Sequence, residues 1–151
     1  MPTRLDSLRR VLAAELPITQ HFGITVQSGG EKGVVLRLPL IPNRNHQGGI
    51  FAGSLNAVAT LAGWAVVWLA LQQASIGVAV VIQDSTIEYL APVGEDCFAH
   101  CDQPDAGTLD RFLETIGRHD RARLGLTVHL LAGTGQVGRF AGRYVALRSR
   151  R

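Results

Sequence analysis

One uninterrupted apolar stretch constrains the fold of this chain more than any other feature. From Ile50 to Leu71 there is no charged residue, and the run is rich in alanine and leucine but sparse in valine and isoleucine. This composition favours a helix over a strand. We therefore predict one long helix, which follows a polar, glycine-containing loop. The candidate caps for its start are Asn45, Gln47 and Ser54.

A helix of this composition fits two settings. About 20 apolar residues can cross a bilayer, whereas a helix wrapped by a sheet is apolar on all sides because it is buried. Ser54, Asn56 and Thr60 interrupt the run, no Lys or Arg lies close to its C-terminal end, and there is no second run of this kind. We expect a core helix and no membrane association. Because no signal peptide is apparent at the N-terminus, we expect a cytoplasmic protein.

Length and charge describe an ordinary globular chain. The 151 residues suit one domain, which we predict to span residues 1–151 with an N-terminal helix over residues 1–16. The formal net charge is only +3. A short basic end is typical of a solvated terminus, so we expect no nucleic-acid partner. The basic residues near that end are Arg143, Arg148, Arg150 and Arg151.

The two cysteines predict neither a disulfide nor a metal site. Cys97 and Cys101 are four residues apart on a predicted strand, which places their side chains on one face but well apart. No second cysteine pair or histidine cluster completes a zinc site. We therefore expect two reduced structural thiols, no metal and no cofactor.

Alternating apolar residues and turn residues predict about six strands around the long helix. Most of these strands are joined by hairpin-length turns, which favours the α+β class with one helix packed on an antiparallel sheet. Turns are expected at residues 28–30 and 133–135, and residues 109–116 are predicted to form a short helix or turn. The predicted strands cover residues 21–27, 33–38, 78–91, 96–102, 123–132 and 137–148.

The longest predicted strand carries a carboxylate among apolar residues. Asp84 shares its parity with Val80 and Ile82, and residues of one parity lie on one face of a strand. If that face points inward, Asp84 is either a buried carboxylate bonded to backbone amides or a functional group. Ser85 has the other parity and is the weaker candidate to reach the same cavity.

Three motifs resemble the hot-dog thioesterases. They are NRNHQGGIFAGS at residues 43–54, the Gly-Trp pair at residues 63–64, and IQDSTIEYLAPV at residues 82–93. The resemblance is closest to the YiiD C-terminal domain family and covers nearly the whole chain after about residue 15. It implies a sheet wrapped around the long helix, a homodimer or homotetramer, and substrates at the subunit interface that are acyl thioesters of CoA or acyl-carrier protein.

The resemblance also implies catalytic residues. Related hot-dog thioesterases have an Asn, then seven residues later the residue whose amide binds the oxyanion, then eight residues later an acid. On this sequence these positions are Asn45, Ala52 and Thr60. Thr60 departs from the pattern, because a hydroxyl cannot replace a carboxylate as base at neutral pH. Asp84 is the candidate for the missing carboxylate, and His46 is a second candidate acid or base.

The loop and the first helical turn are expected to hold the substrate. Unpaired amides at a helix N-terminus can stabilise charge on a carbonyl oxygen, and glycines allow a close approach, although they can also serve helix–sheet packing. Trp64 and Trp68 are core residues or walls of an acyl tunnel. The candidate substrate-binding residues are Gly49, Phe51, Gly53, Ser54 and Ser85.

Two functions remain open from the sequence. The first is a thioesterase acting on acyl-CoA or acyl-carrier protein, which Asn45 together with Asp84 favours. The second is a non-catalytic or weakly catalytic acyl-thioester binder of fatty-acid metabolism, which Thr60 favours. No nucleophile elbow or Ser-His-Asp order is recognisable, so a serine hydrolase is not expected.

Overall fold

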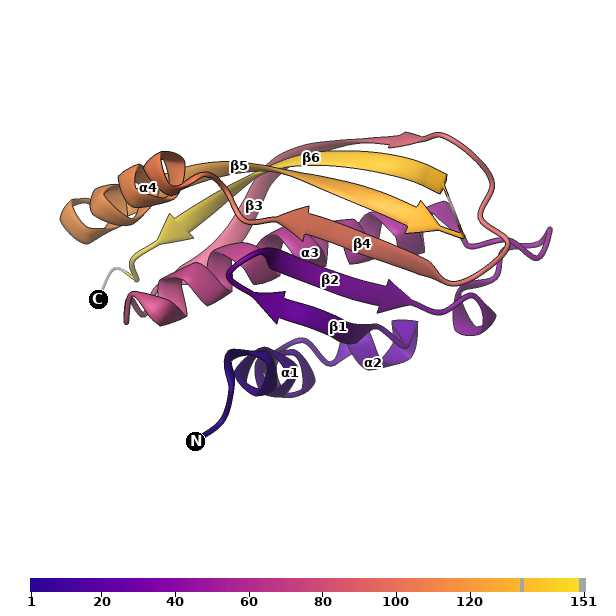
Figure 1. Ribbon diagram of the computed structural model, residues 1–151, viewed down its shortest axis with the longest axis horizontal. Helices are drawn as coiled ribbons and strands as arrows, with labels where there is room; N and C mark the ends of the chain where they lie inside the picture. The colour runs from indigo at the N-terminus through magenta and orange to yellow at the C-terminus, as the bar shows by residue number, and fades with distance from the viewer. Residues whose placement is uncertain (134, 150–151) are drawn as a thin grey trace.

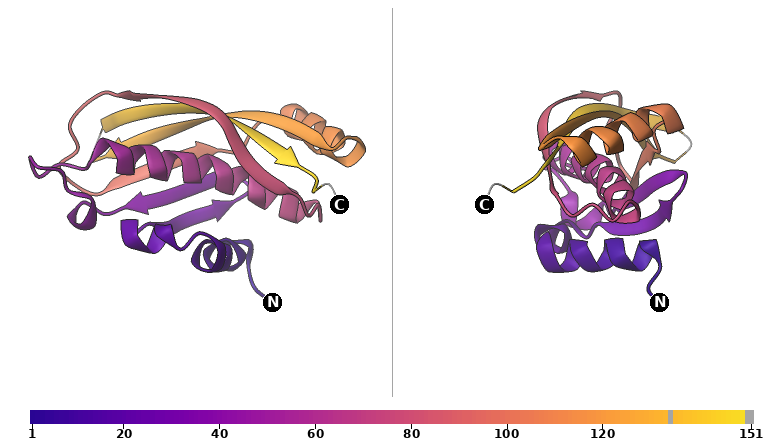
Figure 2. Two further views of the ribbon diagram at one scale, coloured as in Figure 1. Left: turned by 180° about the vertical axis from the view of Figure 1, so that it is seen from behind. Right: turned by 90° about the vertical axis from the view of Figure 1, so that its left-hand side faces the viewer.

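A six-stranded antiparallel sheet wraps around the long helix α3 (Ala52–Gln73) in the computed structural model, which describes residues 1–133 and 135–149 (Figures 1 and 2). The strand order is β1-β2-β4-β5-β6-β3. The predicted hot-dog arrangement of the α+β class is confirmed. The strands are β1 (Thr25–Gly30), β2 (Gly33–Leu38), β3 (Ala79–Tyr89), β4 (Cys97–Asp102), β5 (Arg121–Ala132) and β6 (Gly135–Leu147).

Helix α3 is the centre of the core. It has the length and mean hydropathy of a membrane span, 1.6 in its most apolar window, but 72% of that window is buried inside the protein. The sheet therefore covers the apolar side chains of α3, whose composition alone fits both a core helix and a membrane span. The helix begins at Ala52 after Phe51, and no side chain caps it, so the predicted side-chain caps are wrong.

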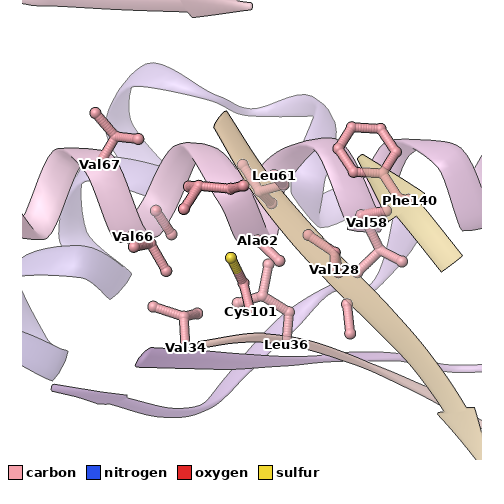
Figure 3. Close-up of a cluster of buried hydrophobic side chains, with 14 of the residues drawn as sticks. Val34, Leu36, Val58, Leu61, Ala62, Val66, Val67, Cys101, Val128 and Phe140 are labelled. Atoms are coloured by element: carbon pink, nitrogen blue, oxygen red, sulfur yellow. The ribbon is translucent and has the colours of Figure 1, made fainter. Parts of the chain in front are cut away.

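The buried face of α3 packs on the inner face of the sheet. Figure 3 shows this contact, in which valine, leucine and alanine side chains of α3 meet residues from four strands. Full burial of one such side chain stabilises the fold by about 1.5–3 kcal/mol. The labelled contributors are Val58, Leu61, Ala62, Val66 and Val67 from α3, and Val34, Leu36, Cys101, Val128 and Phe140 from the sheet.

Two helices precede the sheet. Helix α1 (Arg4–Glu15) starts with a capping box between Thr3 and Asp6, and it packs on β1. Helix α2 (Ile18–Phe22) ends at Gly23 with a φ of 69°, a conformation that glycine adopts without strain. The predicted strand over residues 21–27 is therefore wrong in its first half.

The elements after α3 largely match their predictions. Helix α4 (Ala106–Arg118) is longer than the helix predicted at residues 109–116, because Asp105 caps it through a bond from the Thr108 amide. At the other end, Arg148 donates to the Ile116 carbonyl at 2.6 Å. Residue 134 of the turn predicted at residues 133–135 lies outside the described residues, as do residues 150 and 151 of the basic end.

Strand β3 has two properties that matter for the site. It lies at the end of the strand order, and within the described residues it pairs only with β6. Its pairing also contains a bulge, because Ile82 lies opposite Tyr144 while Asp84 lies opposite Arg143. Gln83 is the extra residue, so the alternation of faces changes at this point.

Candidate active site

A groove runs along α3 between the helix, β3 and the N-terminal segment. Its volume is about 740 Å³, and its lining is mainly apolar. In the left view of Figure 2, which is seen from behind, β3 crosses over α3. One stripe of α3, at helical spacing, forms its floor. The lining residues are Gly53, Asn56, Ala57, Thr60, Leu61 and Trp64 from α3, Val80, Val81, Ile82 and Ser85 from β3, Leu16, Ile18, Thr19, Phe22 and Ile24 from the N-terminal segment, and Tyr144 from β6.

The groove begins at the N-terminal end of α3, which no side chain caps. The Phe51 carbonyl accepts bonds from the Ser54 and Leu55 amides, at 3.0 and 3.2 Å. The amides of Ala52 and Gly53 donate to no acceptor in the part of the chain that the structure describes. Gly53 lines the groove, whereas Ala52 lines a second pocket of about 320 Å³. The two unpaired amides therefore lie where the two cavities approach each other.

Asn45 shapes the loop before α3. Its Oδ1 accepts from the backbone amides of Gln47 and Gly49, at 2.9 and 3.1 Å, and the backbone N–H of Asn45 donates to the Gly49 carbonyl at 2.7 Å. This uses the side-chain oxygen inside the loop, so Nδ2 is the group of Asn45 with donor capacity for a ligand. Asn45 lines the second pocket together with Ala52. His46 is exposed and lines neither cavity.

Thr60 lines the groove, but its hydroxyl is already bonded. Oγ1 donates to the Asn56 carbonyl at 2.9 Å, and the Thr60 carbonyl accepts from the Tyr144 hydroxyl at 2.7 Å. The bond from Tyr144 ties β6 to the helix, and the Thr60 hydroxyl, bonded within its own helix, supplies no base. Asn56, one turn earlier on the same stripe, is a polar groove residue that the sequence reasoning missed. The sequence signal that could have indicated this role is the amide side chain of Asn56 within a mainly apolar run.

The predicted inward placement of Asp84 is wrong. The bulge places it opposite Arg143, on the outer face of the sheet, where its side chain is exposed. Arg143 Nε donates to Asp84 Oδ1 at 2.8 Å, and Nη2 donates to Oδ2. The hydrogen-bonded guanidinium holds the pKa of the Asp84 carboxyl below its ordinary value. A solvated, ion-paired carboxylate of this kind is a poor base near neutral pH.

The same bulge turns Ser85 toward the helix. Ser85 lies opposite Gly142, which shares its face of β6 with the buried residues Phe140 and Tyr144. Ser85 accordingly lines the groove, contrary to the ranking from parity. In the described lining of the groove there is no carboxylate and no imidazole.

The residues predicted to bind the substrate lie partly at the cavities and partly away from them. Phe51 is 57% exposed beside Gly53, and Ser54 is buried in the core. Neither these two residues nor Gly49 line the groove or the second pocket, whereas Gly53 and Ser85 do. A Cβ on Gly49 would lie 3.0 Å from the Val93 carbonyl oxygen, so this glycine serves loop packing.

The cysteines are buried free thiols away from the groove. Burial raises the pKa of Cys97 to about 11 and that of Cys101 to about 12. Both thiols are therefore protonated near neutral pH and are poor nucleophiles. The described residues contain no cluster of His, Cys, Asp or Glu that could hold a metal ion.

Solved structures share this fold over nearly their whole length. A protein of unknown function from Chlorobaculum tepidum is 29% identical, with 95% of this chain and 93% of that chain covered and a TM-score of 0.89. A protein from Shewanella oneidensis described as a "putative thioesterase" is also 29% identical, with coverage of 95% and 97% and a TM-score of 0.82. A "probable thioesterase" from Pseudomonas aeruginosa, 22% identical with 99% of each chain covered and a TM-score of 0.83, shares the fold.

The groove and the loop lie inside the segment that matches a family model. That model is described as "Putative thioesterase (yiiD_Cterm)" and matches residues 5–148, which include α3, β3 and the loop before α3. The resemblance seen in the sequence motifs is thereby confirmed, and the chain belongs to this thioesterase family.

Proposed function

We propose that this protein hydrolyses acyl thioesters whose carbonyl carbon lies at the start of α3. The observation that carries the proposal is the pair of unpaired amides on Ala52 and Gly53, at the mouth of an apolar groove. A carbonyl oxygen that gains charge during attack by water would accept both N–H groups. One such donor lowers the barrier enough to raise kcat about 10²–10³-fold in comparable sites.

In this proposal each cavity receives one part of the substrate. The acyl chain enters the apolar groove along α3, and the carrier arm, from CoA or acyl-carrier protein, leaves past Asn45 through the second pocket. Asn45 Nδ2, Asn56 and Ser85 supply hydrogen bonds to the thioester or to the attacking water. Tyr89 also lines the second pocket, but its hydroxyl already donates to the Ala52 carbonyl at 3.2 Å.

We further propose that the working form is a homodimer or a homotetramer. The free edge of β3 exposes backbone groups that another strand can pair, and Val81 and Tyr89 on it are 45% and 47% exposed. Pairing of two β3 edges would bring a second copy beside the groove. Light scattering at micromolar concentration checks this, and a monomer would contradict it.

A second candidate function is supported by one observation. The described groove residues include no group that can serve as a general base near neutral pH. A protein that binds acyl thioesters without turning them over, or with slow turnover, fits that lining. Binding of acyl-CoA without release of free CoA thiol would select this function.

A proline substitution at Ala52 tests the oxyanion site. Ala52 is the first helical residue, where proline is well tolerated, and Phe51 before it already has the extended conformation that a following proline requires. Ala52→Pro removes one N–H and leaves the helix in place. We expect kcat for acyl-CoA hydrolysis, followed by thiol release, to fall about 10²–10³-fold.

The matched control is Ala52→Val, which adds similar bulk but keeps the N–H donor. It should retain most of the wild-type kcat. If Ala52→Pro keeps the wild-type kcat, the carbonyl does not bind at this amide and the placement is wrong.

A further inference from the structure

The groove changes character along its length. Near the start of α3 it is lined by Gly53, Asn56 and Ser85, whereas toward the middle of the helix its walls are aliphatic and aromatic. The N-terminal segment adds Leu16, Ile18, Phe22 and Ile24 to the apolar lining. A ligand with a polar head and a hydrocarbon tail fits this gradient, with its tail pointing toward Trp64.

Trp64 marks one end of the groove on α3. It is the last residue of the α3 stripe that lines the cavity, and its indole Nε1 donates to the Val80 carbonyl on β3 at 3.2 Å. Its ring also stacks on Trp68, with the centroids 6.0 Å apart and the planes at 20°. The hydrogen bond ties the helix to the edge strand, and the stack limits rotation of the ring. Trp64 is therefore a fixed wall between two elements.

We propose that Trp64 is the residue that limits the length of the acyl chain, an inference that rests on the proposed function because it assumes that the acyl chain occupies the groove. Gly53 and Trp64 are eleven residues apart in α3, about 16 Å at ~1.5 Å per residue. An extended hydrocarbon advances about 1.25 Å per carbon, given bonds of about 1.5 Å at near-tetrahedral angles. The groove then accepts straight acyl chains of up to about a dozen carbons.

A panel of straight-chain acyl-CoA substrates from acetyl to palmitoyl tests the limit. In the wild type, kcat/KM should rise roughly fourfold per added methylene while the chain fills the groove, and then fall once the chain reaches Trp64. Trp64→Leu removes the ring but keeps an apolar side chain, so it should move the maximum to longer chains. Trp68→Phe is the matched control, since Trp68 lies outside the lining and a phenyl ring keeps the stack on Trp64, and it should leave the maximum unchanged.

Fluorescence gives a readout that does not need hydrolysis. Trp64 and Trp68 are the two tryptophans of the chain, so Trp68→Phe leaves Trp64 as the sole indole reporter. Titration with non-hydrolysable acyl thioethers of CoA should shift the Trp64 emission to shorter wavelength only when the chain is long enough to reach the ring. In Trp64→Phe, the remaining Trp68 should not respond to chain length.

The two readouts separate this inference from the proposed function. Chain-length-dependent emission from Trp64 without any thiol release would retain the wall and replace the hydrolase by the acyl-thioester binder. The inference is overturned if Trp64→Leu keeps the wild-type chain-length maximum, or if the emission of Trp64 is the same for short and long chains.

Discussion

Substitution of Gly63 by alanine should destabilise this protein, although it raises helix propensity. Gly63 lies in the interior of α3, where alanine is favoured over glycine by about 1 kcal/mol. A Cβ at this position, however, would lie 2.5 Å from Cζ and 2.6 Å from Cε2 of Tyr144, and closer still to its hydroxyl. Tyr144 has no exposed surface, and although it borders the groove, its hydroxyl is held by the Thr60 carbonyl, so its ring cannot move aside without breaking that bond.

The size of the effect follows from these contacts. Forcing an extra methyl into a packed core costs about 1–3 kcal/mol. Displacement of the ring also breaks the bond from the Tyr144 hydroxyl to the Thr60 carbonyl, and an unmade buried bond costs about 1–3 kcal/mol. After subtraction of the propensity gain, the free energy of unfolding should fall by about 3 kcal/mol, or about 6–12 °C in Tm.

Thermal unfolding followed by circular dichroism at fixed protein concentration measures this loss. Gly117→Ala is the matched control, because Gly117 lies in α4 and a Cβ there would meet nothing within 4 Å. That variant should gain up to about 1 kcal/mol. Tyr144→Phe, which removes only the hydroxyl, should lose less than Gly63→Ala. If Gly63→Ala unfolds at or above the wild-type Tm, the reasoning from the close contact is refuted.

Two further predictions concern carboxylates. Asp84→Asn should leave kcat unchanged, because Asp84 pairs with Arg143 on the outer face of the sheet; a loss of most thioesterase activity with an intact fold would restore the catalytic role inferred from its parity. Asp96 accepts from the Leu40 amide at 2.9 Å and from Arg37 at 2.6 Å, and these bonds lower the pKa of Asp96. Because the pKa of Asp96 is lowered in the folded state, its stabilisation is fully present above the ordinary pKa and is lost as the pH falls through the lowered pKa. Asp96→Asn should therefore flatten the decline of Tm below about pH 4. Equal declines of Tm in the wild type and in Asp96→Asn would contradict this.

Much of the fold could be predicted because local composition and burial agree. The uncharged, alanine-rich run predicts the helix, and the sheet around it explains why the helix is apolar on all sides. The short helix α2 was missed, since Ile18–Phe22 contains isoleucine, threonine and phenylalanine, which favour strands. Its helical form depends on the packing of Thr19 and Phe22 against their neighbours, which no local propensity encodes.

The site could be predicted only in part, and the reason is β3. The loop before α3 and the start of that helix were recognisable from their glycines and polar residues, and Gly53 does line the groove. The facing of Asp84 and Ser85 was not predictable, because a parity argument assumes unbroken alternation. The bulge is defined by the partner strand β6, about 60 residues further along the chain, so the pattern of β3 alone does not contain it.

The bulge also bears on which changes of length β3 can tolerate. Gln83 is one residue more than the pairing with β6 requires, and its side chain accepts a bond from Arg123 Nε at 2.9 Å. A chain that lacked Gln83 would still place Asp84 opposite Arg143 and would keep Ser85 facing the groove. A chain that gained one residue in β6 opposite the bulge would instead exchange the faces of everything beyond it. An insertion in β6, unlike the loss of Gln83, would therefore change which side chains this strand presents to the groove.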